Sequence, residues 1–126
     1  MKITVIGGNS GTGAQVVRLA AQVGHQVTCL SRSGFSAAPE GVHDVRGDAL
    51  DDEVVRAAVA GADAVVVTVG GTSGSGRHRT QVTSAVIAAM QSAGVRRLIV
   101  QSSLGVGDSM ELMPAPARLL ARTVGP

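Results

Sequence analysis

The sequence predicts an α/β protein built on a doubly wound parallel sheet with helices on both faces, a three-layer αβα arrangement. Strand-like apolar runs alternate with helical stretches along the chain, and a glycine-rich segment joins the first strand to the first helix. Parallel neighbours require right-handed crossovers. Numbered along the chain, the strands are therefore expected in the order 3-2-1-4-5. Ligands of such sheets bind at the carboxyl ends of the strands, here between strands 1 and 4.

Composition sets the broad class. The 126 residues suit one domain over 1–126, and 44% of them are hydrophobic, enough for a packed core. Phe35 is the only aromatic residue, so aliphatic side chains must fill that core. The net charge of +2 comes from dispersed arginines, Lys2 being the only lysine. Without aromatic platforms for bases, nucleic acid is not an expected partner, whereas a small anion is. No signal-peptide core or membrane span is evident, so the expected compartment is the cytoplasm.

The individual elements follow from β-branched runs, helical spacing and stop signals. Strands are expected over 2–6, 25–30, within 42–48, and over 62–69 and 96–103. Helices are expected over 13–24, 51–60, 80–94 and from Pro114 onward. Loops rich in serine, glycine or proline are expected over 31–41 and 70–79, and residues 104–113 are expected to be irregular. The strand over 62–69 is apolar enough to be buried on both faces.

The glycines after the first strand are spaced G-x-x-x-G-x-G, at Gly7, Gly11 and Gly13. The first glycine permits a sharp turn, and the later ones let the backbone approach a pyrophosphate and let the helix lie close to the sheet. The helix N-terminus offers free N–H groups, and Ser10 and Thr12 add hydroxyls. The spacing differs from the standard G-x-G-x-x-G fingerprint, and a purely structural turn is the alternative. A strand before and a helix after favour a dinucleotide phosphate.

The second strand ends in Ser31, Arg32 and Ser33. A site that prefers NAD places a carboxylate here to hold the ribose 2′-hydroxyl, and none is present. A guanidinium flanked by hydroxyls suits a 2′-phosphate instead. The alternative is that Arg32 is an ordinary solvated arginine.

The remaining reactive residue types give no second site. Cys29, the only cysteine, lies within an apolar strand and is expected to be a buried small side chain rather than a reactive thiol. His25, His43 and His78 are scattered, so no metal site is expected. His78 stands between two arginines in the loop over 70–79, which is expected to be solvated, with a substrate clamp as the alternative.

Four segments together resemble the short-chain dehydrogenase/reductase superfamily: VIGGNSGTGAQVV, LSRS, RGDALD and SAGVRRLIVQSS. The similarity is to its atypical NAD(P)H-binding branch, with the NmrA-like regulators and the flavin or biliverdin reductases. It covers nearly the whole chain in order. It implies a Rossmann-like fold and, with Arg32, NADP(H) as the cofactor in preference to NAD(H).

The resemblance also implies roles for individual positions. The pyrophosphate would be lined by Gly7, Gly11 and Gly13, helped by Asn9, Ser10 and Thr12. The 2′-phosphate would be held by Arg32 and Ser33, the adenine would face Asp48 and Ala49, and the ribose would lie along Val69 and Gly70. Ser102 and Ser103 match the end of the strand that carries the family's active-site serine near the nicotinamide, with Ser103 the catalytic candidate. Asp48 could instead cap a helix, and the serine pair could instead satisfy backbone groups.

The chain differs from the superfamily pattern in its catalytic pair and in its C-terminal part. Its Tyr-x-x-x-Lys pair is absent, because the chain has no tyrosine and its one lysine is Lys2. Some atypical members dispense with that pair and leave the hydride chemistry to the cofactor. The chain is also expected to hold the cofactor half without the C-terminal substrate-binding part. The strand over 96–103 would then be an apolar sheet edge, and the final helix, a second copy or another partner is expected to cover it.

Three functions therefore remain open. The first is an NADPH-dependent oxidoreductase acting on a small acceptor. The second is a non-catalytic NADP(H)-sensing regulator, which the missing tyrosine and lysine favour. The third is an interaction module that binds no cofactor.

Overall fold

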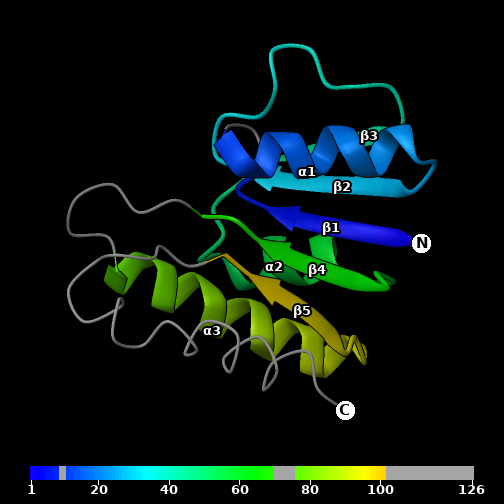
Figure 1. The fold of residues 1–126 in the computed structure, drawn as a ribbon. Helices are drawn as coiled ribbons and strands as arrows, with labels where there is room; N and C mark the ends of the chain where they lie inside the picture. The colour runs from blue at the N-terminus through cyan, green and yellow to red at the C-terminus, as the bar shows by residue number, and fades with distance from the viewer. Residues whose placement is uncertain (9–10, 70–75, 102–126) are drawn as a thin grey trace, which may run out of the picture.

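In the part of the chain that the structure describes, five parallel strands form a single sheet in the order β3-β2-β1-β4-β5, as the alternating pattern predicts (Figure 1). The computed structural model describes residues 1–8, 11–69 and 76–101. The strands are β1 (Lys2–Ile6), β2 (Gln26–Ser31), β3 (Val42–Arg46), β4 (Ala64–Val67) and β5 (Arg97–Val100). The order reverses between β1 and β4, so these two strands flank the switch point.

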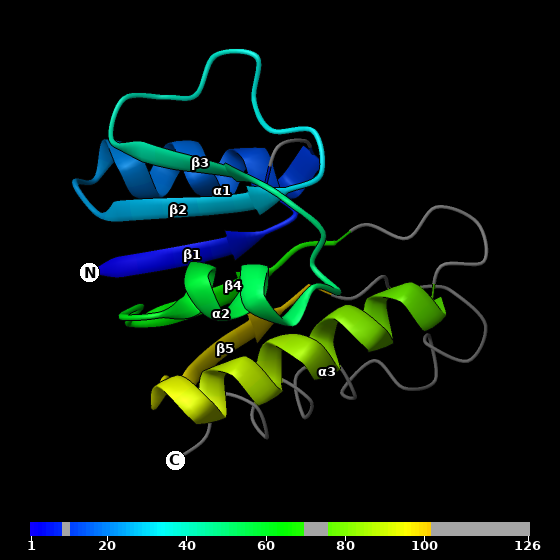
Figure 2. The same cartoon turned by 180° about the vertical axis from the view of Figure 1, so that it is seen from behind.

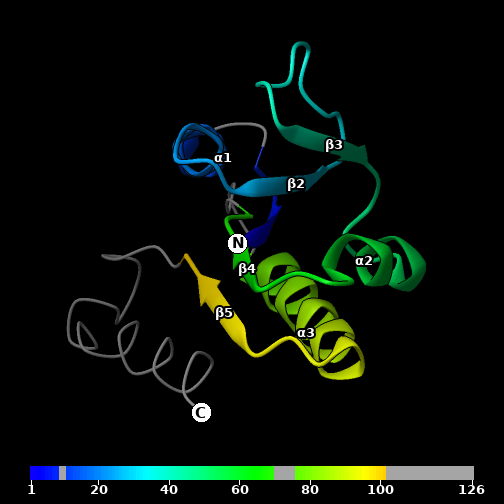
Figure 3. The same cartoon turned by 90° about the vertical axis from the view of Figure 1, so that its right-hand side faces the viewer.

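Within the described residues, three helices cover the two faces of this sheet. They are α1 (Gly11–Gln22), α2 (Asp52–Val59) and α3 (Gly76–Ala93). Helix α1 lies against one face, beside β2, while α2 and α3 lie on the other (Figure 3). This is the predicted three-layer arrangement. No helix in the described ranges is long and apolar enough to cross a membrane.

Each face has its own core of aliphatic side chains. On the α1 face, Val5, Val17, Val27 and Cys29 are buried together. On the other face a larger cluster forms around Ile6, where α2 and α3 pack on the sheet. Because successive strand residues point to opposite faces, neighbouring side chains in β1 serve different cores.

Strand β4 lies inside the sheet, between β1 and β5. Ala64, Val65 and Val67 are buried and Val66 is half-buried, which confirms the expectation of burial on both faces. Strand β5 alternates instead: Leu98 and Val100 are buried, whereas Ile99 is 47% exposed. The described residues pair β5 with β4 alone, so the cover expected over its outer edge stays a prediction.

Helix boundaries differ from those expected. Helix α1 begins at Gly11 rather than at Gly13. Helix α3 begins at Gly76, so the expected loop through Arg79 is wrong in its last residues, and His78 is helical. The first turn of α3 is polar and carries no apolar periodicity. Arg79 Nε donates to the Val69 carbonyl oxygen at 3.5 Å, which ties this turn to the segment after β4. The irregular segment 104–113 and the helix expected from Pro114 lie outside the described residues.

Candidate functional site

The glycine loop leaves the carboxyl end of β1 and is fixed to the strands on either side. The Gly7 N–H donates to the Leu30 carbonyl oxygen at 2.7 Å, which continues the ladder with β2. The Thr68 N–H donates to the Ile6 carbonyl oxygen at 2.9 Å on the β4 side. The buried Thr68 hydroxyl lies 3.2 Å from the carbonyl oxygens of both Ile6 and Gly7, to which it can donate. The loop therefore starts from a rigid base at the switch point.

Two glycines of the predicted motif are tightly enclosed, Gly7 with little room for a side chain and Gly13 with none. Gly7 has a φ of +85°, and a Cβ there would lie 3.2 Å from the backbone N and Cα of Val69. A Cβ on Gly13 would lie 2.7 Å from the Gly7 carbonyl oxygen and 2.8 Å from the Gly8 Cα, and would also collide with the Thr68 hydroxyl. Because those obstacles include backbone, the first turn of α1 packs directly on the loop.

Gly8 has a structural role that the sequence analysis did not assign. A Cβ at this position would lie 2.8 Å from Cys29 Sγ, 2.8 Å from Val5 Cγ1 and 2.9 Å from Val17 Cγ2. The loop therefore rests on the core of the α1 face. Gly11 differs, because its φ is +56° but a Cβ would meet nothing within 4 Å. Its backbone is open on that side.

The first N–H groups of α1 have no acceptor within the helix, as at any helix N-terminus. Thr12 is exposed in this first turn, and its hydroxyl oxygen accepts a hydrogen bond from Gln101 Nε2 at 3.1 Å. Because the oxygen accepts that bond, its own O–H remains a donor. Helix dipole, N–H groups and hydroxyl together favour a bound anion.

The segment after β2 is held in a defined turn. Ser31 is buried, its Oγ accepts from the Gly34 N–H at 3.0 Å, and its carbonyl oxygen accepts from the Gly47 N–H at 2.9 Å. Arg32 and Ser33 follow at once and are exposed. No carboxylate stands in residues 31–35. Arg32 therefore stands at the carboxyl edge of the sheet, where Rossmann-type folds hold the adenosine end of a dinucleotide.

Asp48 and Ala49 follow β3 at the same edge of the sheet. Asp48 Oδ1 accepts from the Leu50 N–H at 2.9 Å, which forms a local turn. The N-cap of α2 is Asp51, whose carboxylate accepts from the N–H groups of the next helical residues, so the cap alternative for Asp48 is wrong. Ala49 is half-buried and packs against the core of the α2 face.

Of the other predicted site residues, only Val69 lies within the described residues. Val69 is half-buried just after β4 and contacts the loop at Gly7. The positions outside the described residues are Asn9, Ser10, Gly70, Ser102 and Ser103. Their assigned roles remain predictions.

Cys29 is fully buried beneath the glycine loop, as the sequence predicts. Burial raises the pKa of its thiol to about 11, with a smaller contribution from Asp44 in the same direction, while a hydrogen bond with the Gly8 backbone lowers it. The thiol is therefore neutral and is a packing group. His25 Nδ1 lies 3.0 Å from the terminal amine of Met1. The described part of the chain contains no cluster of metal-binding side chains.

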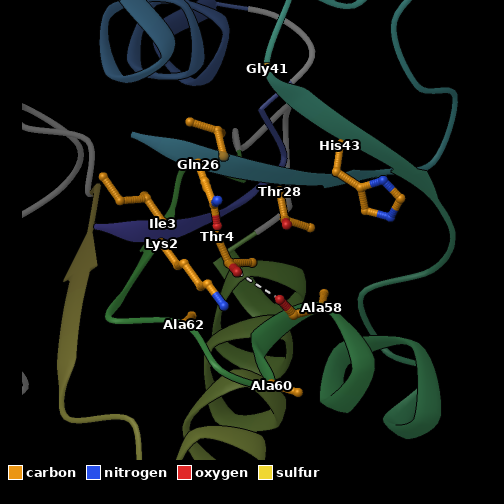
Figure 4. Close-up of a pocket in the computed structure, with 11 residues that line it drawn as sticks. Lys2, Ile3, Thr4, Gln26, Thr28, Gly41, His43, Ala58, Ala60 and Ala62 are labelled. Atoms are coloured by element: carbon orange, nitrogen blue, oxygen red, sulfur yellow. Dashed lines mark hydrogen bonds between the residues drawn. The ribbon is translucent and has the colours of Figure 1, made fainter. Parts of the chain in front are cut away.

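A cavity of about 380 Å³ lies at the opposite, amino-terminal end of the sheet (Figure 4). Lys2, Gln26 and Thr28 line it together with His43, and Ala58 forms part of its α2 side. Its polar lining comes from sheet positions that the short α2 leaves uncovered. Ligands of doubly wound sheets bind at the carboxyl edge, so this cavity is separate from the glycine loop.

The geometry at the carboxyl edge fits a dinucleotide. The close approach of α1 and the loop, the open backbone at Gly11 and the helix N-terminus match a pyrophosphate. The exposed guanidinium of Arg32 matches a further anionic group one strand away.

Comparison with known proteins agrees with this reading. The chain is 39% identical over 117 residues to 2-alkyl-3-oxoalkanoate reductase from Stenotrophomonas maltophilia, covering 84% of this chain and 34% of that enzyme. A Rossmann-fold NAD(P)-binding protein from Shigella flexneri superposes with a TM-score of 0.73 at 22% identity, over 98% of this chain and 62% of the other. A uronate dehydrogenase variant from Agrobacterium tumefaciens, solved with NAD, gives a TM-score of 0.70 at 20% identity, over 81% and 40%.

The two solved structures establish the Rossmann-like fold, and the chain spans about a third of the reductase. The model of the NAD(P)H-binding family matches residues 7–123, nearly the whole length. The chain therefore belongs to the NAD(P)H-binding family, consistent with an atypical short-chain dehydrogenase/reductase, and its cofactor is a nicotinamide dinucleotide.

Proposed function

We propose that this chain binds NADP(H) in preference to NAD(H). The observation that carries the proposal is the end of β2, where the exposed Arg32 stands between two serines and residues 31–35 include no acidic residue. The two coenzymes differ only in the 2′-phosphate. A guanidinium attracts that group, and the carboxylate typical of NAD sites would repel it. Ser33 supplies a further hydroxyl beside it.

We further propose that the protein serves an NADPH-dependent oxidoreductase reaction on a small-molecule acceptor. The similarity to a reductase supports this. The cofactor, when bound, supplies the hydride. The glycine loop and the α1 N-terminus hold the pyrophosphate, Arg32 holds the 2′-phosphate, and Ser103 is the candidate for contacting the reacting end.

Calorimetric titration of the chain with NADPH and NADH tests the cofactor proposal. Arg32→Ala should weaken NADPH binding about tenfold or more while leaving NADH binding unchanged, because hydrogen bonds to charged groups contribute about 1.5–3 kcal/mol. Arg56→Ala is the matched control, an exposed arginine on α2. Equal affinities for the two coenzymes in the unmodified chain would overturn the preference.

A non-catalytic NADP(H) sensor is the second candidate, favoured by the absence of tyrosine and of any lysine but Lys2. NADPH oxidation in the presence of quinone or flavin acceptors separates the two functions. Turnover that is lost in Ser103→Ala supports the enzyme, and tight NADPH binding without turnover supports the sensor. Failure to bind either nucleotide would support the interaction module. A homo-oligomer or partner that covers the β5 edge remains part of the proposal, and light scattering tests the homo-oligomer.

A further inference from the structure

A second arginine stands beside the proposed 2′-phosphate site. Arg46 is the last residue of β3 and pairs in register with Ser31, the residue before Arg32. The loop between these parallel strands leaves the carboxyl end of β2 and returns to the amino end of β3 (Figure 2). Arg46, at the end of β3, and Arg32, just after β2, therefore both lie at the carboxyl edge of the sheet.

The Arg46 side chain lies across the start of that loop. A Cβ on Gly34 would lie 2.5 Å from Arg46 Nε and 2.8 Å from its Cγ, so the guanidinium rests on glycine backbone. Arg46 Nη2 donates to the Phe35 carbonyl oxygen at 3.4 Å. A guanidinium carries five N–H donors. Arg46 is exposed, so donors other than the one bonded to Phe35 can reach a ligand.

The loop segment under Arg46 is anchored. The Phe35 ring packs against the core of the α1 face, and its N–H donates to Asp44 Oδ2 at 2.9 Å. Gly34 adopts a φ of +71°, and its N–H donates to Ser31 Oγ. Asp44 supplies a carboxylate on the same face of β3, and its Oδ1 is buried without a hydrogen-bond partner. Asp44 and Arg46 thus both contact the loop at Gly34, and Arg32 and Arg46 are both exposed.

We propose that Arg46 is a second specificity-determining residue, which contacts the 2′-phosphate of NADP(H) together with Arg32. A single anion at this edge attracts both exposed guanidiniums, that of Arg32 after β2 and that of Arg46 at the end of β3. A phosphate with two negative charges satisfies both, which a ribose hydroxyl does not. The inference rests on the proposed preference for NADP(H).

Two other roles for Arg46 make different predictions. A guanidinium stacked on the adenine would serve both coenzymes equally, because adenine is common to them. A guanidinium that only supports the loop would act through the position of Arg32, and would have no effect once Arg32 is removed.

The test is calorimetry with NADPH and NADH on Arg32→Ala, Arg46→Gln and the double variant, with Arg56→Gln as the control on α2. Arg46→Gln should weaken NADPH binding about tenfold, leave NADH binding unchanged, and weaken NADPH binding further in the Arg32→Ala background. Arg46→Lys, which keeps the charge, should lose less. Retained NADH binding shows that each variant is folded.

The outcomes separate the two proposals. If Arg32→Ala is selective for NADPH but Arg46→Gln is not, or if the Arg46 effect disappears in the double variant, the role of Arg46 is overturned and the NADP(H) preference stands. If the unmodified chain does not distinguish NADPH from NADH, or binds neither, both proposals fail.

Discussion

Thr12 and Gln101 are 89 residues apart in sequence, yet Gln101 Nε2 donates to Thr12 Oγ1 at 3.1 Å. The bond joins the residue just after β5 to the first turn of α1. The Gln101 N–H also donates to the Val67 carbonyl oxygen at 2.9 Å, so the end of β4 belongs to the same arrangement. The strand that leads to the predicted active-site serine is thus tied to the helix proposed to hold the pyrophosphate.

Thr12→Val should weaken NADPH and NADH binding by the same factor, about tenfold or more. The loss follows from one hydrogen bond to a charged acceptor, about 1.5–3 kcal/mol, and the pyrophosphate is common to both coenzymes. Calorimetric titration measures both affinities. Thr28→Val, at the opposite end of the sheet, is the control and should change neither. A selective loss of NADPH binding in Thr12→Val would contradict a pyrophosphate contact.

Gly13→Ala should destabilise the protein although Gly13 lies in a helix. Replacing a helical glycine by alanine normally stabilises by about 1 kcal/mol. Here the new Cβ would lie 2.7 Å from the Gly7 carbonyl oxygen and 2.8 Å from the Gly8 Cα, neither of which can rotate away. Overpacking of this kind costs about 1–3 kcal/mol, so we expect a lower free energy of unfolding and loss of nucleotide binding. Urea denaturation and calorimetry measure the two effects.

Gly24→Ala is the control for Gly13→Ala. Gly24 has a φ of +98°, and a Cβ there would meet nothing within 4 Å. Its cost should be the backbone strain alone, about 1–2 kcal/mol, with nucleotide binding retained. If both variants behaved alike in binding, the contact between α1 and the loop would not shape the site.

The sheet order could be predicted because alternation, right-handed crossovers and the glycine loop after the first strand together favour the Rossmann order. Alternating strands and helices leave few topologies, and the carboxyl ends of the strands then share one edge. The role of Gly8 could not be predicted, since its constraint comes from Cys29 and Val17, which are distant in sequence.

The residue that caps α2 also could not be predicted from the sequence. Asp48 and Asp51 are both acceptable caps locally, and the choice follows from the strand before them. The Gly47 N–H still bonds to the Ser31 carbonyl oxygen, so a turn at Asp48 is needed before the helix begins. The link between Gln101 and Thr12 likewise depends on how strand ends meet in space.

Thr4→Val should lower the free energy of unfolding by about 1–3 kcal/mol. Thr4 is buried in β1, and its hydroxyl donates to the Ala58 carbonyl oxygen at 2.6 Å (Figure 4). Ala58 lies in the last turn of α2, where carbonyl groups lack a partner within the helix. Valine keeps the shape but leaves that buried oxygen unpaired. Urea denaturation measures the loss, and a near-neutral result would mean that another group satisfies Ala58.

Cys29 should make stability fall as the pH rises from 9 to 11. Its thiol is fully buried, and burial raises its pKa from an ordinary value of 9.0 to about 11. Between these values the unfolded chain has lost the thiol proton while the folded chain retains it, so deprotonation favours unfolding. One pKa unit corresponds to about 1.4 kcal/mol, and the full loss is therefore about 2–3 kcal/mol.

Few other groups change charge in this range. The chain has no tyrosine and one lysine, Lys2, and arginine stays protonated. Urea denaturation at pH 8, 9, 10 and 11 should therefore show the decline in the unmodified chain and a much flatter profile in Cys29→Ala. The variant itself should be less stable at pH 8, because it leaves a small void beneath Gly8. The same slope in both proteins would mean that the thiol titrates alike in the folded and unfolded states, and that its burial under the glycine loop is incomplete in solution.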